Sequence, residues 1–238
     1  MNILIVAAHP DDEVLGCGGA IVKHVMAGDK VHLLVFTDGV TSREYTPGIS
    51  EARLMKLCSK KIKIRKNEFY KAAKILGVKK RDISFYDLPD NRMDSIPLLD
   101  IIKRIEIISL KIKFDIIYTH HWGDVNIDHR KCLEAVLTAF RPSRRPGNTI
   151  AIYCFEIPGN MDVLPPFAEN KFDPDHYVDI SDSIDTKRNA INAYLNELKN
   201  LPPDLKIEKI MEHSRKRGKE YGVKYAEAYV EATSEVMK

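Results

Sequence analysis

The chain has 238 residues, enough for one sizeable α/β core with a small appendage. Hydrophobic residues make up 44% and charged residues 30%, which is ordinary for a globular protein. The formal net charge of +3 comes from 37 basic and 34 acidic residues. Because no long basic run accompanies it, this charge gives no indication of a nucleic-acid partner, and we expect none.

The cellular setting is inferred from features that the sequence lacks. No stretch approaches the roughly 20 apolar residues that span a bilayer, so we expect no membrane span. The first residues lack the basic segment and cleavage site of a signal peptide, which predicts a cytoplasmic protein. The cysteines are widely spaced and form no CxxC pair, so neither a thiolate zinc site nor a disulfide framework is expected. They are Cys17, Cys58, Cys132 and Cys154.

Strands and helices are predicted to alternate from residue 2 to residue 155. Apolar runs predict strands at 2–8, 30–36, 82–88, 115–119 and 149–155. Helical spacing of apolar residues predicts helices at 14–26, 51–76, 97–112 and 132–140. A loop is expected at 40–50. This alternation predicts an α/β fold: a Rossmann-like, mostly parallel sheet with helices on both faces.

The first predicted helix contains Gly16, Gly18 and Gly19. Glycine is unfavourable inside a helix, so we expect either close packing or the close approach of a ligand at these positions. Their spacing does not match GxGxxG, and they follow the acidic loop instead of lying within it. A dinucleotide site is therefore not expected there.

The alternation weakens after residue 156. A loop is predicted at 158–175, a short strand at 177–180, and helices at 183–198 and 207–216. Residues 225–232 alternate apolar and acidic side chains, which fits either a late strand or a frayed helix. We expect a single domain over 1–238, in which residues 156–238 complete the pocket or form an oligomer contact.

Polar residues follow each of the first four predicted strands. They are His9 to Glu13, then Thr37, Asp38 and Arg43, then Asp90 and Arg92, and finally His120 to His129. Ligands of such sheets bind outside the carboxyl ends of the strands. We therefore expect one site at this edge.

Two histidines and one aspartate of these clusters match the ligand set of a catalytic zinc ion. His9 and Asp12 share a loop, and a parallel sheet can bring His129 alongside them. Three-ligand zinc sites leave a position open for water, whose pKa the metal lowers towards about 7. We therefore predict Zn²⁺ as the cofactor.

Two further carboxylates adjoin the predicted ligands. Asp11 is the candidate general base, which would later protonate the leaving group. Asp128 precedes His129 and is expected to hold a ligand imidazole by its other ring N–H. Glu13 has no assigned role beyond favourable electrostatics at a helix start.

Two motifs together resemble those of the PIG-L/LmbE-like deacetylases. They are Ala8-His9-Pro10-Asp11-Asp12-Glu13 and Asn126-Ile127-Asp128-His129. The family consists of zinc enzymes that remove acetyl groups from N-acetylglucosamine-type amino sugars. The resemblance implies the same ligands and base. It also implies that Arg65 binds substrate and that Asp90 binds sugar hydroxyls. The alternatives are a surface pair of Arg65 with Glu68, and a turn-shaping role for Asp90.

The second motif departs from the family pattern at Asn126, where many relatives have a histidine that helps to stabilise the oxyanion. Asparagine donates a hydrogen bond but cannot deliver a proton or carry charge. Either Asn126 suffices together with zinc, or His120, His121 or Asp124 takes over at the substrate.

The predicted function is zinc-assisted amide hydrolysis of an N-acetyl amino sugar or its conjugate, with release of acetate. One alternative is amidase action on a thiol–sugar conjugate, which only a panel of substrates separates from deacetylation. The other is a non-catalytic, nucleotide-binding Rossmann-like module, which would hold no stoichiometric metal.

Overall fold

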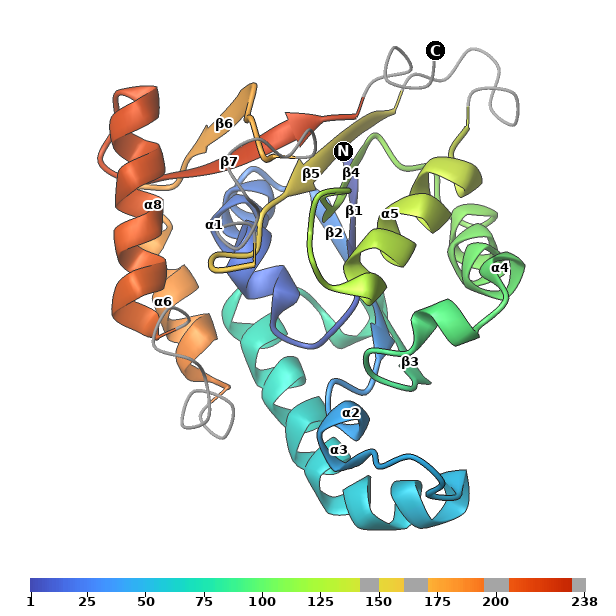
Figure 1. The fold of residues 1–238 in the computed structure, drawn as a ribbon. Coiled ribbons are helices and arrows are strands. Elements are labelled where there is room, and N and C mark those ends of the chain that lie inside the picture. The colour runs from blue at the N-terminus through green and yellow to red at the C-terminus, as the bar shows by residue number, and fades with distance from the viewer. Residues whose placement is uncertain (142–149, 161–170, 195–205, 233–238) are drawn as a thin grey trace.

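A seven-stranded sheet forms the centre of the computed structural model, which describes residues 1–141, 150–160, 171–194 and 206–232 (Figure 1). The strands are β1 (Asn2–Ala7), β2 (Lys30–Thr37), β3 (Ile83–Leu88), β4 (Ile116–His120), β5 (Ala151–Phe155), β6 (His176–Asp179) and β7 (Ala226–Glu231). Their order is β3-β2-β1-β4-β5-β7-β6. β1 to β5 pair in parallel, and β7 pairs antiparallel with both β5 and β6. The predicted mostly parallel α/β fold is confirmed.

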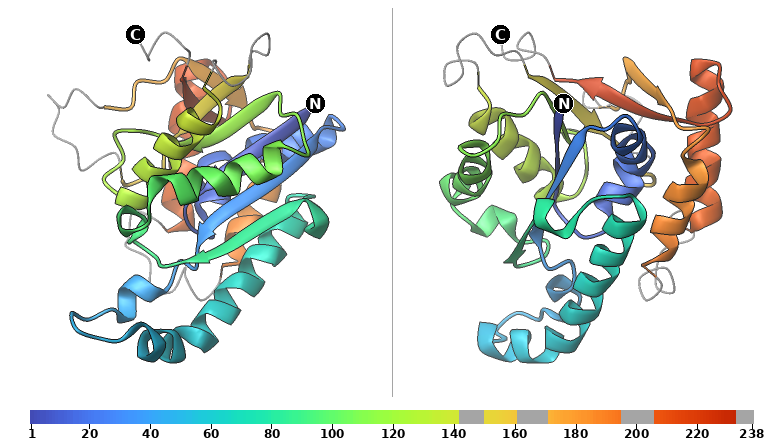
Figure 2. Two further views of the ribbon diagram at one scale, coloured as in Figure 1. Left: turned by 90° about the vertical axis from the view of Figure 1, so that its right-hand side faces the viewer. Right: turned by 180° about the vertical axis from the view of Figure 1, so that it is seen from behind.

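Helices cover both faces of this sheet, as Figure 2 shows from two further directions. One face packs against α1 (Asp12–Met26), α3 (Glu51–Ile75) and α6 (Ile184–Asn192), and the other against α4 (Leu98–Ser109) and α5 (Ile127–Ala139). The remaining helices are α2 (Thr41–Glu44) and α8 (Ile207–Tyr221), with 3-10 turns at Lys80–Asp82 and Met93–Ser95. Among the described residues, no helix is both long and apolar enough to cross a membrane.

β1 is buried on both faces, which explains its unbroken apolar sequence. Ile3 and Ile5 belong to the core that includes α1 and α3. Leu4 and Val6 belong to the core that includes α4 and α5. The strand therefore delivers the polar loop that follows it to the centre of the sheet edge.

Several element boundaries differ from the prediction. The expected loop at 40–50 contains the short helix α2, and α1 and α5 begin earlier than predicted, at Asp12 and Ile127. Acidic residues in a first helical turn are favoured by the helix dipole, so these polar segments are helical and not loops. Residues 225–232 form strand β7 and not a frayed helix. The predicted helix 183–198 ends at Asn192, and its last residues lie outside the described ranges.

The glycines of α1 are explained by close packing. A Cβ atom on Gly16 would lie 2.3 Å from the ring of Phe155, and one on Gly19 would lie 2.5 Å from Ile180. Between them the helix is interrupted at Cys17, whose φ of −143° and ψ of 23° are not helical. The two alternatives predicted for these glycines thus resolve in favour of packing.

A buried ion pair from the C-terminal part of the chain forms hydrogen bonds with backbone groups on either side of the interruption at Cys17. Lys187 Nζ donates to the carbonyl of Leu15 at 3.0 Å and to Glu227 Oε1 at 2.6 Å. Glu227 in turn accepts the backbone N–H groups of Gly19 and Ala20, both at 2.8 Å. Buried backbone polar groups require such partners. α1 is therefore held in place by residues far along the chain, and its first turn carries Asp12.

Candidate active site

A cavity of about 220 Å³ opens at the carboxyl ends of the central strands. Seven of the predicted site residues line it: His9, Asp11, Asp12, Arg65, Asp90, Asn126 and His129. Some of the lining residues come from the loop and helix after β1. Others come from the start of α5. The topology therefore joins segments more than 100 residues apart, as the parallel order predicts.

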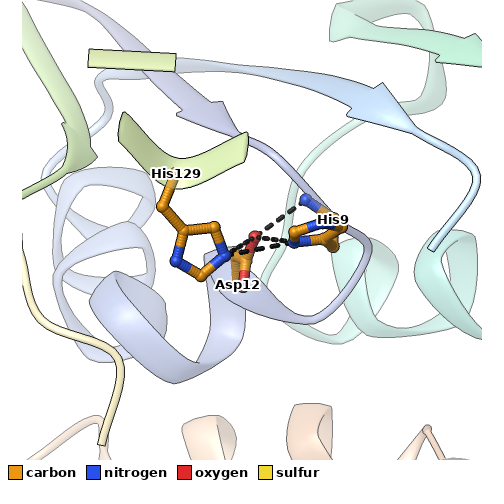
Figure 3. Close-up of side chains that lie close together, drawn as sticks. All are labelled: His9, Asp12 and His129. Carbon is orange, nitrogen blue, oxygen red and sulfur yellow. Dashed lines mark hydrogen bonds and ion pairs between the residues drawn. The ribbon is translucent and has the colours of Figure 1, made fainter. Parts of the chain in front are cut away.

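The three predicted metal ligands converge within this cavity (Figure 3). His9 Nδ1 lies 3.1 Å from Asp12 Oδ2 and 3.1 Å from His129 Nε2, and His129 Nε2 lies 3.4 Å from Asp12 Oδ2. A tetrahedral zinc ion with bonds of about 2.0–2.2 Å separates its ligands by about 3.3–3.6 Å. The spacing and the donor types therefore fit one such ion.

The electrostatics of the cluster also favour a bound cation. Burial opposes a positive charge on His129, but Asp12 and Asp124 outweigh it and raise the pKa of His129 to about 9. Burial likewise opposes a charge on His9, yet Asp12, Asp128 and Asp90 raise its pKa well above the ordinary value. The carboxylates thus draw positive charge to this point, either as protons or as a metal ion.

Carboxylates hold the outward-facing nitrogens of both histidines. His129 Nδ1 lies 2.8 Å from Asp124 Oδ2. His9 Nε2 lies 3.1 Å from Asp90 Oδ1 and 3.3 Å from Asp128 Oδ2. A ring nitrogen that donates to a carboxylate leaves the other nitrogen with a lone pair for a metal. The arrangement orients both lone pairs towards the shared point.

Asp11 has a strained backbone, with φ of 114° and ψ of −27°. Its N–H donates to Glu13 Oε2 at 2.9 Å, and the hydroxyl of Tyr194 donates to the other oxygen of Glu13. Arg65 Nη2 donates to Asp11 Oδ2 at 2.8 Å, and its guanidinium lies 5.2 Å from the ring centre of Tyr194. A non-glycine residue with this φ persists only where its surroundings hold it. Glu13 and Tyr194 supply that support.

The chain matches the family model described as "PIG-L: GlcNAc-PI de-N-acetylase" over residues 4–140. This segment contains the three predicted metal ligands, Asp11 and helix α5, which begins at the cavity. The chain belongs to the PIG-L family. Its members are deacetylases, so the chain is a hydrolytic enzyme.

Individual relatives agree with this assignment. The chain is 30% identical over 145 residues to YaiS of Escherichia coli K12, an uncharacterized deacetylase, covering 59% of this chain and 68% of that one. It is similar in structure to N,N'-diacetylchitobiose deacetylase of Pyrococcus horikoshii, with a TM-score of 0.73 and 22% identity over 100% of this chain and 85% of that one. GalB, the 4-carboxy-2-hydroxymuconate hydratase of Pseudomonas putida KT2440, shares the fold with a TM-score of 0.70 and 21% identity over 98% and 96% of the two chains. Because a hydratase shares it, the fold alone does not determine the reaction.

Four of the predicted site residues do not line the cavity of this PIG-L protein: His120, His121, Asp124 and Asp128. His120 is fully buried, accepts the N–H of Ala8 at Nε2 and stacks on His129. Burial and the neighbouring His129 lower the pKa of His120 to about 4. His121 accepts the N–H of Gly123 and packs against Trp122, and burial lowers its pKa to about 4.

Asp128 and Asp124 contact loops as well as His9 and His129. Asp128 accepts the N–H groups of Asn91 at 2.7 Å and Met93 at 2.8 Å, which holds the loop after β3 against α5. Asp124 accepts the N–H of Asn126 at 2.8 Å and the side-chain amide of Asn160 at 3.0 Å.

Seven other cavity residues had no individual role predicted, although Arg43 belongs to the polar cluster expected after the second strand. They are Leu15, Gly39, Ser42, Arg43, Asn91, Ile157 and Asn160. Most of them follow β2, β3 or β5, so the expected position of the site edge is the only sequence signal that marks them. Position 39 requires a glycine, because its φ is +65° and a Cβ there would lie 2.8 Å from Pro10.

Proposed function

We propose that this PIG-L protein is a zinc-dependent hydrolase that removes the acetyl group from an N-acetylglucosamine-type amino sugar or its conjugate. The observation that carries the proposal is the convergence of His9, Asp12 and His129 beside Asp11 in one cavity. The names of relatives that act on acetylated sugars, such as diacetylchitobiose, support the substrate class.

The residues that would hold the ion are His9, Asp12 and His129, oriented by the carboxylates behind them. When bound, zinc supplies a Lewis acid that polarises a carbonyl oxygen and acidifies water. The chain's own contribution is the fixed spacing of the three donors and their low exposure.

Asp11 is the proposed base. It takes a proton from the water that attacks the acetamide carbon, and it returns that proton to the amine nitrogen as the C–N bond breaks. The products are acetate and a free amine. The Arg65 guanidinium at 2.8 Å favours the ionised form of Asp11 that this step needs.

Asn126 is the proposed donor to the developing oxyanion. Its Oδ1 accepts the N–H of Asp128 at 2.9 Å, so its NH₂ group is the part left to donate in the cavity that it lines. Among the alternatives, His120 and His121 do not line this cavity, and Asp124 offers only acceptor oxygens when ionised. These placements support Asn126 as the oxyanion donor.

The proposed sugar contacts come from the segments that follow β2 and β3. Asp90 lines the cavity with Ser42, Arg43 and Asn91, and these polar groups suit sugar hydroxyls. Asp90 already contacts His9 and Ser42, so its orientation is held before substrate arrives. Ile157 and Asn160 extend the lining, which supports a pocket-completing role for part of residues 156–238.

The test is acetate release from a panel of N-acetyl sugars, free and nucleotide-linked, together with a thiol–sugar amide. We expect acetate from at least one N-acetyl sugar with zinc supplied, and none from Asp11→Asn, which should retain the metal in elemental analysis. Asp182→Asn, a change at an exposed aspartate between β6 and α6 that does not line the cavity, serves as the control and should keep full activity. Full activity of Asp11→Asn would refute the base assignment, and cleavage of the thiol–sugar amide alone would favour the amidase.

A further inference from the structure

A second, larger cavity lies at the opposite edge of the sheet, where β1, β2 and β3 begin. Its volume is about 740 Å³, and it lies between the starts of these strands and the ends of α1, α3 and α4. A slot of about 290 Å³ adjoins it and shares His32, Arg81, Asp82, Lys111 and Ile112 with it. We call the two together the amino-edge cavity. It shares no lining residue with the cavity that holds the metal donors.

Positive charge predominates around the amino-edge cavity. Five cations line it: Lys30, Lys79, Arg81, Lys111 and Lys113. It has two acidic residues, of which Asp29 is already paired with the N-terminal ammonium at 2.7 Å and with His24 at 2.8 Å. Three helix ends add about half a negative charge each. The cations still exceed the negative charges, so helix-end electrostatics alone does not account for them.

A buried polar side chain faces this cavity without a hydrogen-bond partner. His32 is only 9% exposed and lines both parts of the cavity. Among the described residues it makes a ring contact with Phe114, at 5.5 Å between centroids, and no hydrogen bond. The ring nitrogens of His32 bond no other described residue, so they are open to a ligand that enters the cavity. Burial lowers its pKa, which keeps the ring neutral and able both to donate and to accept.

The slot beside His32 has both apolar and polar walls. Leu4, Leu33, Tyr86 and Ile108 form its apolar walls, and Ser84 adds one hydroxyl. Flat or apolar ligand parts are held by such walls, whereas charged parts prefer the cationic rim. Arg81 and Lys111 line both parts of the cavity, so they lie where the slot meets the larger part.

We propose that the amino-edge cavity binds a phosphate-bearing organic anion of the size of a nucleoside phosphate. The phosphates lie against Arg81 and Lys111, and the ring enters the slot beside His32. Arg81 contacts only its neighbour Asp82, at 3.9 Å, and Lys111 has no ion-pair partner among the described residues. Both are thus available for phosphate, which guanidinium and ammonium groups bind through charge-assisted hydrogen bonds.

The experiment is calorimetric titration of the full chain with ADP, inorganic pyrophosphate and adenosine. We expect saturable binding of ADP, weaker binding of pyrophosphate and adenosine, and a loss of ADP affinity as salt rises. Lys111→Glu and Arg81→Glu should each weaken ADP binding by about tenfold, because each removes a charged contact. His32→Phe should weaken ADP more than pyrophosphate.

Lys219→Glu, an exposed change on α8, is the matched control and should bind ADP like the parent. Acetate release should be the same in all these variants, which separates this site from the proposed deacetylase site. The proposal is overturned if neither anion binds, or if the two charge-reversal variants bind ADP as tightly as the parent. Equal affinities for ADP and pyrophosphate would refute the role of the slot.

Discussion

Replacing Lys187 by methionine tests whether the C-terminal part of the chain holds α1. The side chain is 2% exposed, and its partners are Glu227 at 2.6 Å and the carbonyl of Leu15 at 3.0 Å. Methionine fills a similar volume but leaves Glu227 buried with a charge that lacks its partner. Removing one member of a buried pair costs about 3–5 kcal/mol.

The structure places the expected loss of unfolding free energy at the lower end of this range. Glu227 would keep three donors, the N–H groups of Gly19 and Ala20 and the hydroxyl of Tyr229, each at 2.8 Å. We therefore expect the free energy of unfolding to fall by about 3 kcal/mol, against a total of about 5–15 kcal/mol for a typical domain.

The assay is urea unfolding followed by circular dichroism. Lys216→Met, at an exposed position of α8, is the control and should change stability by less than about 0.5 kcal/mol. The double variant Lys187→Met/Glu227→Gln should be more stable than the sum of the single changes predicts, because the two side chains interact directly. A loss of less than about 1 kcal/mol for Lys187→Met would refute the reasoning, since it would show that the remaining donors suffice.

Three further predictions follow from the site and from the C-terminal helix. Tyr194→Phe removes the hydroxyl that holds Glu13, so kcat should fall several-fold while the free energy of unfolding falls by only about 1 kcal/mol. An unchanged kcat would contradict the inference that Tyr194 and Glu13 support Asp11. Chelation should lower the melting temperature of the purified protein, and added zinc should restore it, because a ligand that binds only the folded state stabilises it; an identical melting temperature with and without chelator would argue against the metal site. Burial opposes the charge of Glu156, but His213 and Arg217 outweigh it and lower its pKa from 4.5 to about 2. Since the folded pKa is the lower one, this stabilisation is complete above pH 4.5 and is lost as the pH falls towards 2, so Glu156→Gln should flatten the acid limb of a stability profile measured over that window.

Much of the sheet edge that holds the candidate active site could be predicted, because it depends on local sequence. A strand buried on both faces must be apolar, so β1 is evident, and its end is marked where His9 begins a polar loop. The parallel order then requires polar residues after neighbouring strands to share one edge. On this basis the approach of His129 to His9 and Asp12 was expected, and the distances between their donor atoms fit the prediction.

Which face a side chain takes at a strand end was not predictable. His120 and His121 are adjacent in sequence, yet His120 stacks on His129 while His121 packs against Trp122. Successive side chains of an extended segment point to opposite faces. The residue at which β4 ends therefore decides which of them approaches His129, and composition does not reveal that residue.

The sequence by itself determined the α/β fold, the sheet edge that holds the site and the convergence of His9, Asp12 and His129, because all three follow from strand periodicity and parallel connections. Only the tertiary structure decided how Asp11 is held. Glu13 meets Tyr194 across 181 positions of the chain, and Arg65 reaches Asp11 across 54. Such contacts depend on how helices pack across a sheet, and no local pattern encodes the partner of a buried carboxylate.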